Sequence, residues 1–549
     1  MTLFLDAIYI LFLLVWLIGT GARIYRQARF YQIEEYMSVR YLRWLMARRD
    51  RWLPTRAFAA TLIGAIFANT LNEAPDTPLP WLIALIAAIA AVLPPREVEI
   101  KKAFRATPRA RRLLATAWLL VALVGVAFVQ VNTGFPSRLR PLLTIALGFA
   151  IFIAAPLLLV TANLLMTPVE AFMRRRFVER ARRTLRAVNP TVIGITGSYG
   201  KTSTKSYLAH ILNGRYRAYP TPKSYNTLMG VCIAINNDIA QDRSIDYFIA
   251  EMGAYVPGEI AQICALTEPR ISIVVEVGPQ HLERFGSLDN IAIAKYEIIK
   301  ALPKDGAGVF NWDNPYIRAM VERGYPDTRL TVSLTVDPAA VTDGIPRFVA
   351  SGVSESLDGL HFTVTDTVTR ESVTFMTTLL GVHNVTNILL AAATAVHEGM
   401  SLQEVAFRVR TLRPADARLT RETTSAGITI LNDGYSANPV GIVGALRALS
   451  LHQTGRRLLV TPGMVELGEL MESENRKLGT IAAAHATDVI LVGDKQVAPI
   501  RDGLIAAGFP VDRVQTVGTL KEAIAWYQRN LTRGDCVLFL NDLPDTYSV

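Results

Sequence analysis

The chain has 549 residues, 51% of them hydrophobic, and a formal net charge of +10. A chain of this length exceeds what one hydrophobic core usually organises, so we expect two to four domains. Residues 1–190 contain 25 Lys and Arg against 10 Asp and Glu, whereas the remainder contains 32 against 37. The excess positive charge therefore lies among apolar segments, where it indicates membrane topology and excludes a nucleic-acid-binding surface as its explanation.

The three cysteines are also informative. Cys232, Cys264 and Cys536 lie far apart and lack the spacing of metal ligands or of a redox pair. We therefore expect no structural disulfide, and the cysteine pattern fits a soluble portion in a reducing compartment.

Five apolar stretches in the first third are candidate membrane-spanning helices: Phe4–Ile18, Ala57–Leu71, Trp81–Leu93, Leu113–Val131 and Leu142–Leu165. The last two approach or exceed the roughly 20 residues that a spanning helix needs. The second and third are short, so they are either spans extended by flanking residues or a re-entrant hairpin broken around Pro75, Pro78 and Pro80, and we favour spans. The first lacks the basic start and the cleavage site of a signal peptide. We expect a transmembrane region of about five helices over residues 1–168.

The basic loops predict the orientation of these helices. Residues 23–56 and 96–112 are crowded with Arg and Lys, and such loops stay in the cytoplasm. Five spans then place the N-terminus outside and everything after residue 190 in the cytoplasm. A run of arginines from Arg174 to Arg186 lies in a basic linker, 169–189, and is either a solvated helix or a segment attracted to anionic lipid headgroups. This predicts a multi-pass protein of the inner (cytoplasmic) membrane, with the lipid bilayer as a partner.

A glycine loop predicts a nucleotide site. It follows a short apolar run of β type, Thr191–Ile195, and precedes a helical pattern that continues to Leu212. The loop residues that would cradle phosphates are Gly197, Ser198, Gly200, Lys201, Thr202 and Ser203. The lysine counters the terminal phosphates and Thr202 can ligate magnesium. Since Ile195 stands where the full G-x-x-x-x-G-K-[ST] pattern has glycine, this is a shorter variant, and a chance Gly-Lys-Thr turn is the alternative.

Four more polar residues are candidates for the same site. The β-type run Tyr247–Ala250 ends at Glu251, which places a carboxylate at the carboxyl end of a strand beside the phosphate loop, where it can ligate magnesium or merely cap a turn. Considered alone, His281 is a packed or solvent-facing histidine, and Lys295, in a helical stretch, is a surface lysine. An Asx turn is the ordinary explanation of Asn226.

A series of motifs resembles the Mur ligase family over roughly residues 190–540, and most closely its branch that adds D-alanyl-D-alanine to UDP-N-acetylmuramoyl-tripeptide. The motifs are T-G-S-x-G-K-T-S at 196–203, S-Y-N-T at 224–227, E-M-G-A at 251–254, H-L-E-R-F-G-S at 281–287, A-K-Y-E-I at 294–298, N-W-D-N at 311–314, G-V-H-N-V-T-N at 381–387 and N-D-G-Y-S-A-N-P at 432–439. The resemblance implies an α/β chain in which a helical transmembrane region is followed by a P-loop central domain at 190–412 and a Rossmann-like C-terminal domain at 413–549. Alternating strand and helix patterns after residue 414 agree with the last of these.

The resemblance also implies ATP and two magnesium sites. In the family, the residues matching Glu251 and His281 hold the metals that bridge ATP and the acyl group, and Thr202 would join them. The residue matching Lys295 is carbamylated, which converts it into a carboxylate-like metal ligand. Asn226 would line the acyl-phosphate region. The expected catalytic residues are Lys201, Lys295, His281 and Asn226.

On the nucleotide side, the resemblance assigns the adenine to Asn384 and Asn387, the phosphates to Arg418 and the ribose to Asp433. Asn438, which precedes Pro439, is explained sufficiently as a helix cap.

The implied reaction is an ADP-forming ligation of an acid and an amine. Phosphorylation by ATP turns the carboxylate into an acyl phosphate, and the amine attacks it through a tetrahedral intermediate whose charge the metals and Lys201 can stabilise. The expected partners are a muramoyl-peptide or lipid-linked cell-wall precursor and an amino acid or dipeptide. Because the reactants come from different domains, we expect a rotation about the linker Leu412–Ala417.

Two departures from the family leave the substrate open. Membrane spans replace the soluble domain that holds the uridine nucleotide, and the chain ends N-D-L-P-D-T-Y at 541–547 where that branch has a basic segment. The alternatives are a sibling ligase with another envelope or polyglutamyl acceptor, a P-loop ATPase or nucleotide sensor coupled to a membrane process, and a binding-only relic. Ionisable residues are scarce in the spans, and Glu251, His281 and Lys295 have no purpose in simple ATP hydrolysis, which favours a ligase.

Overall fold

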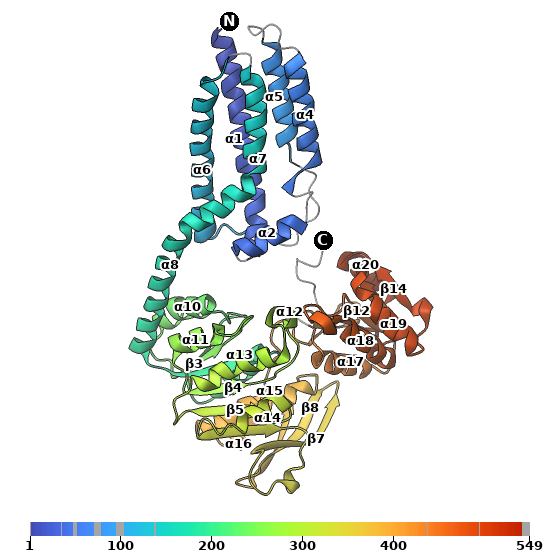
Figure 1. Cartoon of the computed structure of the whole chain (residues 1–549). Coiled ribbons are helices and arrows are strands. Elements are labelled where there is room, and N and C mark those ends of the chain that lie inside the picture. Colours follow the sequence, from blue (N-terminus) through green and yellow to red (C-terminus); the bar gives the residue numbers. More distant parts are fainter. Residues whose placement is uncertain are drawn as a thin grey trace. The chain divides into compact units, whose positions relative to one another are not determined.

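The computed structural model describes residues 2–34, 36–47, 52–70, 78–94, 104–136, 139–435, 437–493 and 495–540 (Figure 1). The chain divides into two compact units, Met1–Arg176 and Phe177–Val549. Pro75, the basic loop residues 96–103 and the segment 541–547, on all of which predictions were made, lie outside the described residues.

The first unit is a helical bundle. Its helices are α1 (Thr2–Ile33), α2 (Ser38–Ala47), α4 (Thr55–Thr70), α5 (Leu79–Val92), α6 (Pro108–Thr133), α7 (Arg140–Ile153) and the first part of α8 (Ala155–Val188). Phe12, Trp16, Trp81 and Phe152 meet edge to face in its interior, with ring centroids 6.1–6.4 Å apart. A Cβ atom added at Gly148 would lie 2.5 Å from Trp16. Glycine at this position therefore lets α7 approach α1 closely, as small residues do between membrane helices.

Among the described residues, three helices are long and apolar enough to cross a membrane by length and composition: Ala7–Ile33, Pro108–Val131 and Ala155–Val188. The helices Leu79–Val92 and Arg140–Ile153 are apolar but shorter. The prediction of one continuous span over Leu142–Leu165 is wrong, because the chain leaves α7 at Ala154 and begins α8. Pro156 explains this break, since proline lacks the N–H that a continuing helix would donate to the carbonyl of Phe152 and its ring crowds that carbonyl. The arrangement of about five spans stays a prediction.

As far as it is described, the second unit contains two sheets. The larger has nine strands in the order β2-β3-β1-β4-β5-β6-β7-β8-β9. The strands are β1 (Thr191–Thr196), β2 (Ala218–Pro220), β3 (Tyr247–Glu251), β4 (Ile271–Val274), β5 (Ala307–Asn311), β6 (Thr328–Ser333), β7 (Phe348–Ser356), β8 (Gly359–Asp366) and β9 (Ser372–Thr377). Neighbours from β2 to β7 pair in parallel, whereas β7, β8 and β9 form an antiparallel meander that the sequence analysis did not predict.

Helices cover both faces of this sheet. One hydrophobic core contains residues of α9 (Lys201–Leu212), α15 (His383–His397) and α16 (Leu402–Val409). The other contains residues of α10 (Leu228–Asn237), α11 (Glu259–Thr267), α12 (Leu282–Phe285), α13 (Leu288–Lys300) and α14 (Pro315–Val321). In β1, Ile193 and Ile195 enter the first core and Val192 enters the second. Burial on both faces explains why this strand is a continuous apolar run.

The smaller sheet has six strands in the order β10-β11-β15-β12-β13-β14. Its elements are β10 (Thr420–Thr423), β11 (Thr429–Asp433), α17 (Gly441–Ser450), β12 (Arg457–Thr461), α18 (Met471–His485), β13 (Asp488–Val492), α19 (Ala498–Ala506), β14 (Val514–Val517), α20 (Leu520–Asn530) and β15 (Cys536–Leu540). All neighbours pair in parallel except β10 and β11. The predicted fold class is confirmed: long apolar helices precede two α/β layers.

Candidate active site

The phosphate loop joins β1 to α9 as the sequence predicts. Gly200 has a φ of 75°, and a Cβ atom there would lie 2.4 Å from Asn387 Oδ1, so glycine is required both for the backbone and for space. The Nζ atom of Lys201 donates to the carbonyl oxygens of Gly197 at 2.5 Å and Ser198 at 3.2 Å. Burial lowers the pKa of Lys201 to about 8. The lysine thus lies across the loop that would cradle phosphates.

Glu251 lies at the carboxyl end of β3, which is adjacent and parallel to β1. Its Oε2 atom accepts from Thr202 Oγ1 at 3.1 Å and from Lys205 Nζ at 3.0 Å, and its Oε1 atom accepts from Asn226 Nδ2 at 3.2 Å. Burial alone would raise the pKa of Glu251, but the charges of Lys205 and Lys201 outweigh it and hold that pKa below its usual value. The carboxylate therefore stays ionised beside the phosphate loop.

These oxygens suit a magnesium ion. Thr202 and Glu251 bring a hydroxyl and an ionised carboxylate into contact at the loop, and hard oxygen ligands of this kind, with substrate phosphates, are what magnesium prefers. Over the described residues there is no group of three or more His, Cys, Asp and Glu side chains placed to hold a metal. Any metal here would therefore draw further ligands from the nucleotide or from groups of another kind.

His281 is the residue before α12 and has a φ of 57°, in the left-handed region. Its Nδ1 atom is hydrogen bonded to Glu466 Oε2, and its ring meets Tyr255 edge to face with centroids 4.7 Å apart. Burial is the main cause of a lowered pKa for His281, and the positive charge of Lys201 contributes. This histidine therefore lies within electrostatic reach of the phosphate loop.

Lys295 lies in α13, and only 3% of its surface is exposed. Its Nζ atom is 5.8 Å from the ring centroid of Phe285. Within the part of the chain that the structure describes, Lys295 has no hydrogen-bonding or ion-pair partner. Burial, with a contribution from the charge of Lys201, lowers the pKa of Lys295 to about 7. A surface lysine, which its sequence context alone suggested, is excluded.

Asn384 and Asn387 are buried on α15 and contact α9. Asn384 Oδ1 accepts from Tyr207 Oη at 2.9 Å and from Asn387 Nδ2 at 3.3 Å, and Asn387 Oδ1 accepts from Thr204 Oγ1 at 3.2 Å. Ser203 is also buried, on α9. The two asparagines thus support the helix that follows the phosphate loop, and their contact with adenine stays a prediction.

Two predicted residues lie at the smaller sheet: Arg418, just before β10, and Asp433, in β11. Asp433 ends β11, accepts from the backbone N–H of Leu419 at 3.1 Å, and has its pKa raised to about 6 by burial. The guanidinium of Arg418 lies 4.3 Å from the ring centroid of Tyr435, whose hydroxyl donates to Ser224 Oγ at 2.6 Å. The charge of Arg418 also lowers the pKa of Lys201. Arg418 therefore lies within electrostatic reach of the phosphate loop, and Asp433 lies within electrostatic reach of Arg418.

Comparisons with known proteins identify the family. The Mur ligase middle domain matches residues 195–395, and the Mur ligase, glutamate ligase domain matches residues 417–541. A UDP-N-acetylmuramoyl-tripeptide–D-alanyl-D-alanine ligase from Mycobacterium leprae is 31% identical over 384 residues, which are 63% of this chain and 70% of that protein. The chain belongs to the Mur ligase family. Members are ATP-dependent amino-acid ligases that use magnesium, so this chain is an enzyme of that class.

Other relatives agree with this assignment. The ligase of the same name from Bacillus subtilis is 29% identical over 360 residues, 65% of this chain and 74% of that protein. Among solved structures, a MurF ligase from Thermotoga maritima in complex with ADP has a TM-score of 0.58 and 23% identity, with 67% of this chain and 80% of that chain covered. A MurF from Acinetobacter baumannii also has a TM-score of 0.58, at 22% identity over 68% of this chain and 78% of that chain. These structures share the fold of this Mur ligase.

Three residues at the candidate site of this Mur ligase were not predicted from the sequence. Lys205 pairs with Glu251, and its spacing of four residues from Lys201 on one helix could have indicated that both face β3. Glu276 follows β4, its backbone oxygen accepts from the N–H of Ser198 at 2.7 Å, and burial raises its pKa to about 7. Glu466 contacts His281 from the smaller sheet, and no local pattern predicts a partner so distant in sequence.

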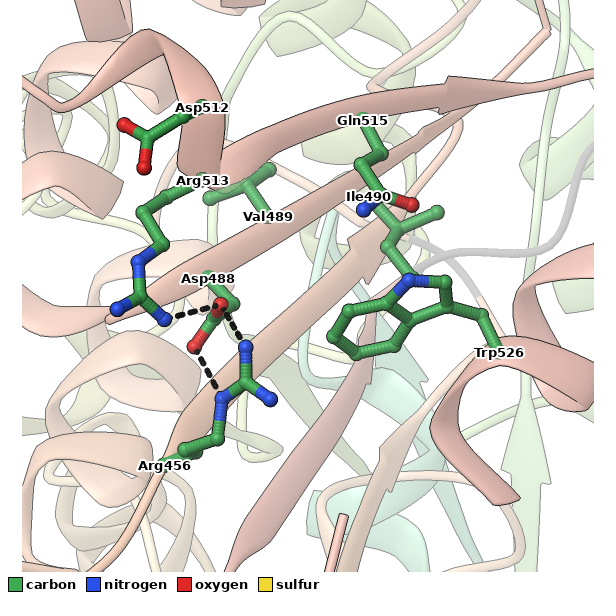
Figure 2. A pocket seen from close by; sticks show the side chains of 8 residues that line it. All are labelled: Arg456, Asp488, Val489, Ile490, Asp512, Arg513, Gln515 and Trp526. Atoms are coloured by element: carbon green, nitrogen blue, oxygen red, sulfur yellow. Dashed lines mark hydrogen bonds and ion pairs between the residues drawn. The ribbon is translucent and has the colours of Figure 1, made fainter. Parts of the chain in front are cut away.

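A cavity of about 230 Å³ lies elsewhere on the smaller sheet, at the amino end of β13 (Figure 2). Figure 2 shows Asp488 between two guanidinium groups, which donate to its carboxylate from Arg456 at 2.6 and 3.1 Å and from Arg513 at 3.2 Å. Asp433, by contrast, stands at the carboxyl end of its strand. Because β11, β15, β12 and β13 run in parallel, the cavity lies at the amino ends of these strands and Asp433 lies at their carboxyl ends.

Proposed function

We propose that this Mur ligase joins an amino acid, or a dipeptide such as D-Ala-D-Ala, to a muramoyl-peptide cell-wall precursor at the cytoplasmic face of the membrane. The ionised Glu251 beside Lys201 and Thr202 of the phosphate loop is the observation that carries the chemistry. The names of the relatives at 29–31% identity support the substrate class. The long apolar helices of the first unit support the membrane location.

The reaction proceeds in two steps. An oxygen of the substrate carboxylate attacks the terminal phosphorus of ATP and ADP leaves, which gives an acyl phosphate. The amine then attacks the acyl carbon, and phosphate leaves with the carbonyl restored and a proton released. Lys201 stabilises the charge that develops on the transferred phosphoryl group, and Asn226 positions the acyl phosphate. Magnesium, when bound, neutralises phosphate charge, and Thr202 and Glu251 are the residues that would hold it.

Lys295 takes part as a carbamate in this proposal. Only a neutral amine adds to carbon dioxide, giving a carbamate and a proton, and a lysine with a pKa of about 7 is neutral in a large fraction of molecules at neutral pH. The carbamate would place a negative charge near the positive charge of Lys201. Together with His281, the carbamate would hold a second magnesium ion, as Thr202 and Glu251 would hold the first.

The domain plan of the proposal keeps the predicted boundaries: a transmembrane region at 1–168, a basic linker at 169–189, a central ATP-binding domain at 190–412 and a C-terminal domain at 413–549. Asn384 and Asn387 lie on the adenine side, Arg418 contacts the phosphates and Asp433 the ribose. Closure about Leu412–Ala417 brings the two ligase domains together on their substrates.

The decisive experiment measures ADP and phosphate release by the full-length protein with magnesium and bicarbonate, across muramoyl peptides, with and without D-alanyl-D-alanine or single amino acids. We expect release that requires both acid and amine and is lost in Lys201→Ala and Lys295→Ala. Lys300→Ala is the matched control, because Lys300 is an exposed lysine on the same helix as Lys295. Release without any acceptor, unaffected by Lys295→Ala, would favour a membrane-coupled ATPase instead.

A further inference from the structure

A short loop of the smaller sheet, the Glu466 loop (Gly463–Leu470), connects β12 to α18. Asn475 fixes its start, because its Oδ1 atom accepts from the N–H of Met464 at 2.8 Å and its Nδ2 atom donates to the carbonyl of Met464 at 2.9 Å. The side chains of Met464 and Leu467 are 1% and 3% exposed in the core beneath. Glu466 lies between these two anchors, so its backbone is held firmly while its side chain leaves the core.

The carboxylate of Glu466 contacts two residues from the domain of the larger sheet. Its Oε2 atom is hydrogen bonded to Nδ1 of His281, and its Oε1 atom is 3.8 Å from Nη2 of Arg284. Arg284 in turn lies over the ring of Tyr255, 4.2 Å from its centroid, and that ring meets the imidazole of His281 edge to face. The side chains of His281 and Arg284 are therefore both fixed by the ring of Tyr255, unlike the mobile side chains of an ordinary surface ion pair.

The backbone is strained at both ends of this contact. His281 has a φ of 57° and Glu466 a φ of 62°. Residues other than glycine adopt this left-handed region at a cost, and such strain gathers at functional positions where the surrounding structure maintains it. The side chains of these two strained residues contact each other, which indicates that the conformations of both loops serve to form this contact.

The chemistry of the contact fixes the histidine. A carboxylate only accepts hydrogen bonds, so Nδ1 carries the proton and Nε2 keeps its lone pair. A partner of this kind commonly orients a metal-binding or catalytic histidine and sets its tautomer.

We propose that Glu466 is a positioning residue, which holds the imidazole of His281 in the ligating tautomer and thereby makes the ligase site dependent on the docked Glu466 loop. The inference rests on the proposed ligase function. It assigns a residue of the C-terminal domain to the acyl-transfer side of the site. The other two C-terminal residues of the proposal, Arg418 and Asp433, are assigned to the nucleotide.

The test uses the full-length protein in nanodiscs and four variants: Glu466→Ala, Glu466→Gln, Glu469→Ala and His281→Ala. Glu469 is the matched control, because it is an exposed glutamate on the same loop. Loss of such an orienting partner typically lowers activity or metal affinity about 10–100-fold. We expect Glu466→Ala to lower kcat within this range, to raise the magnesium concentration for half-maximal activity, and to leave the KM for ATP within about twofold.

Two further measurements separate positioning from a structural role. Glu466→Gln keeps an oxygen that can accept from Nδ1, so it should recover part of the activity that Glu466→Ala loses. The double variant His281→Ala with Glu466→Ala should be no less active than His281→Ala alone, because both changes remove one interaction. Multiplied losses in the double variant, or equal melting-temperature losses in Glu466→Ala and Glu466→Gln with an unchanged magnesium requirement, would overturn the proposal.

Failure of this inference can be told from failure of the proposed function. If the unmodified protein shows acid- and amine-dependent ADP release and Glu466→Ala matches it, the positioning role alone is wrong. If the unmodified protein releases no ADP with any acid and amine, the ligase function is wrong and the positioning role falls with it.

Discussion

Two lysines in the central domain are equally buried but have opposite surroundings. Lys205 and Lys295 are each 3% exposed. The Nζ atom of Lys205 donates to Glu251 Oε2 at 3.0 Å and to the carbonyl of Lys223 at 2.5 Å, whereas Lys295, as far as the structure describes the chain, has neither a hydrogen bond nor an ion pair. Burial disfavours an ammonium unless a partner compensates. The same residue type thus forms an ion pair with a carboxylate in one place, and in the other it has its pKa lowered to about 7 by burial.

The largest effect should come from giving Lys205 the surroundings of Lys295. Glu251→Ala removes the carboxylate and leaves the Lys205 ammonium buried without its partner, a change that typically costs about 3–5 kcal/mol. We expect a large fall in the melting temperature of the full-length protein and no measurable ADP release. The double variant Glu251→Gln with Lys205→Met should melt closer to the unmodified protein, because neither charge remains. Equal melting temperatures for Glu251→Ala and the exposed control Glu322→Ala would contradict the importance of the pair.

Lys295→Ala should separate activity from stability. It leaves no buried charge without a partner, so we expect a melting temperature close to that of the unmodified protein, while ADP release falls by about 10²–10³, the range for loss of one charge-stabilising group. Removing dissolved carbon dioxide should lower the activity of the unmodified protein reversibly and should not affect Lys295→Ala. If carbon dioxide removal has no effect on either protein, the carbamate is excluded while the ligase reaction can still stand.

Two carboxylates of the central domain, Glu276 and Glu251, also differ in their partners. Amide groups of Asn311 and Asn314 donate to it, and among the described residues it forms no ion pair with Lys or Arg. Burial raises its pKa to about 7, whereas the neighbouring lysines lower that of Glu251. The folded state therefore binds the Glu276 proton more tightly than the unfolded state, and stability falls as the pH rises from about 4.5 to about 7.

Glu276→Gln should remove this pH dependence. At about 1.4 kcal/mol per pKa unit, the ionisation of Glu276 costs about 3 kcal/mol above pH 7. We expect the variant to gain in melting temperature relative to the unmodified protein as the pH rises from about 4.5 to about 8, with Glu322→Gln as the exposed control. A difference between variant and unmodified protein that is constant with pH would show that Glu276 ionises normally.

The sequence predicted one part of this site much better than another. The loop from Gly197 to Thr202 follows β1 and Glu251 ends β3, and short apolar strands predicted both positions because the carboxyl ends of adjacent parallel strands must meet. The pairing of Lys205 with Glu251 spans 46 residues, and only the helical spacing from Lys201 hints at it. The pairing of Glu466 with His281 spans 185 residues, and no local pattern encodes it.

The membrane unit shows the same limit. Hydropathy predicted apolar helices but treated Leu142–Leu165 as one span, although Pro156 within it marks the break at Ala154 that the structure shows. In the larger sheet, the meander β7–β9 was not predicted, although the alternating burial of β7 and β9 is typical of strands with one exposed face.

The smallest effect should come from Asn226→Ala. Asn226 donates to Glu251 at 3.2 Å, but that carboxylate keeps Thr202 and Lys205 as donors, so the loss of one hydrogen bond should lower the free energy of unfolding by only about 1 kcal/mol. The KM for the carboxylate substrate should rise, since Asn226 is proposed to position the acyl group. If instead Asn226→Ala lowers the melting temperature as much as Glu251→Ala, the ionised state of Glu251 depends on the neutral amide more than on Lys205. The contrast between the two buried lysines would then reflect a polar network around Glu251 and not one ion pair.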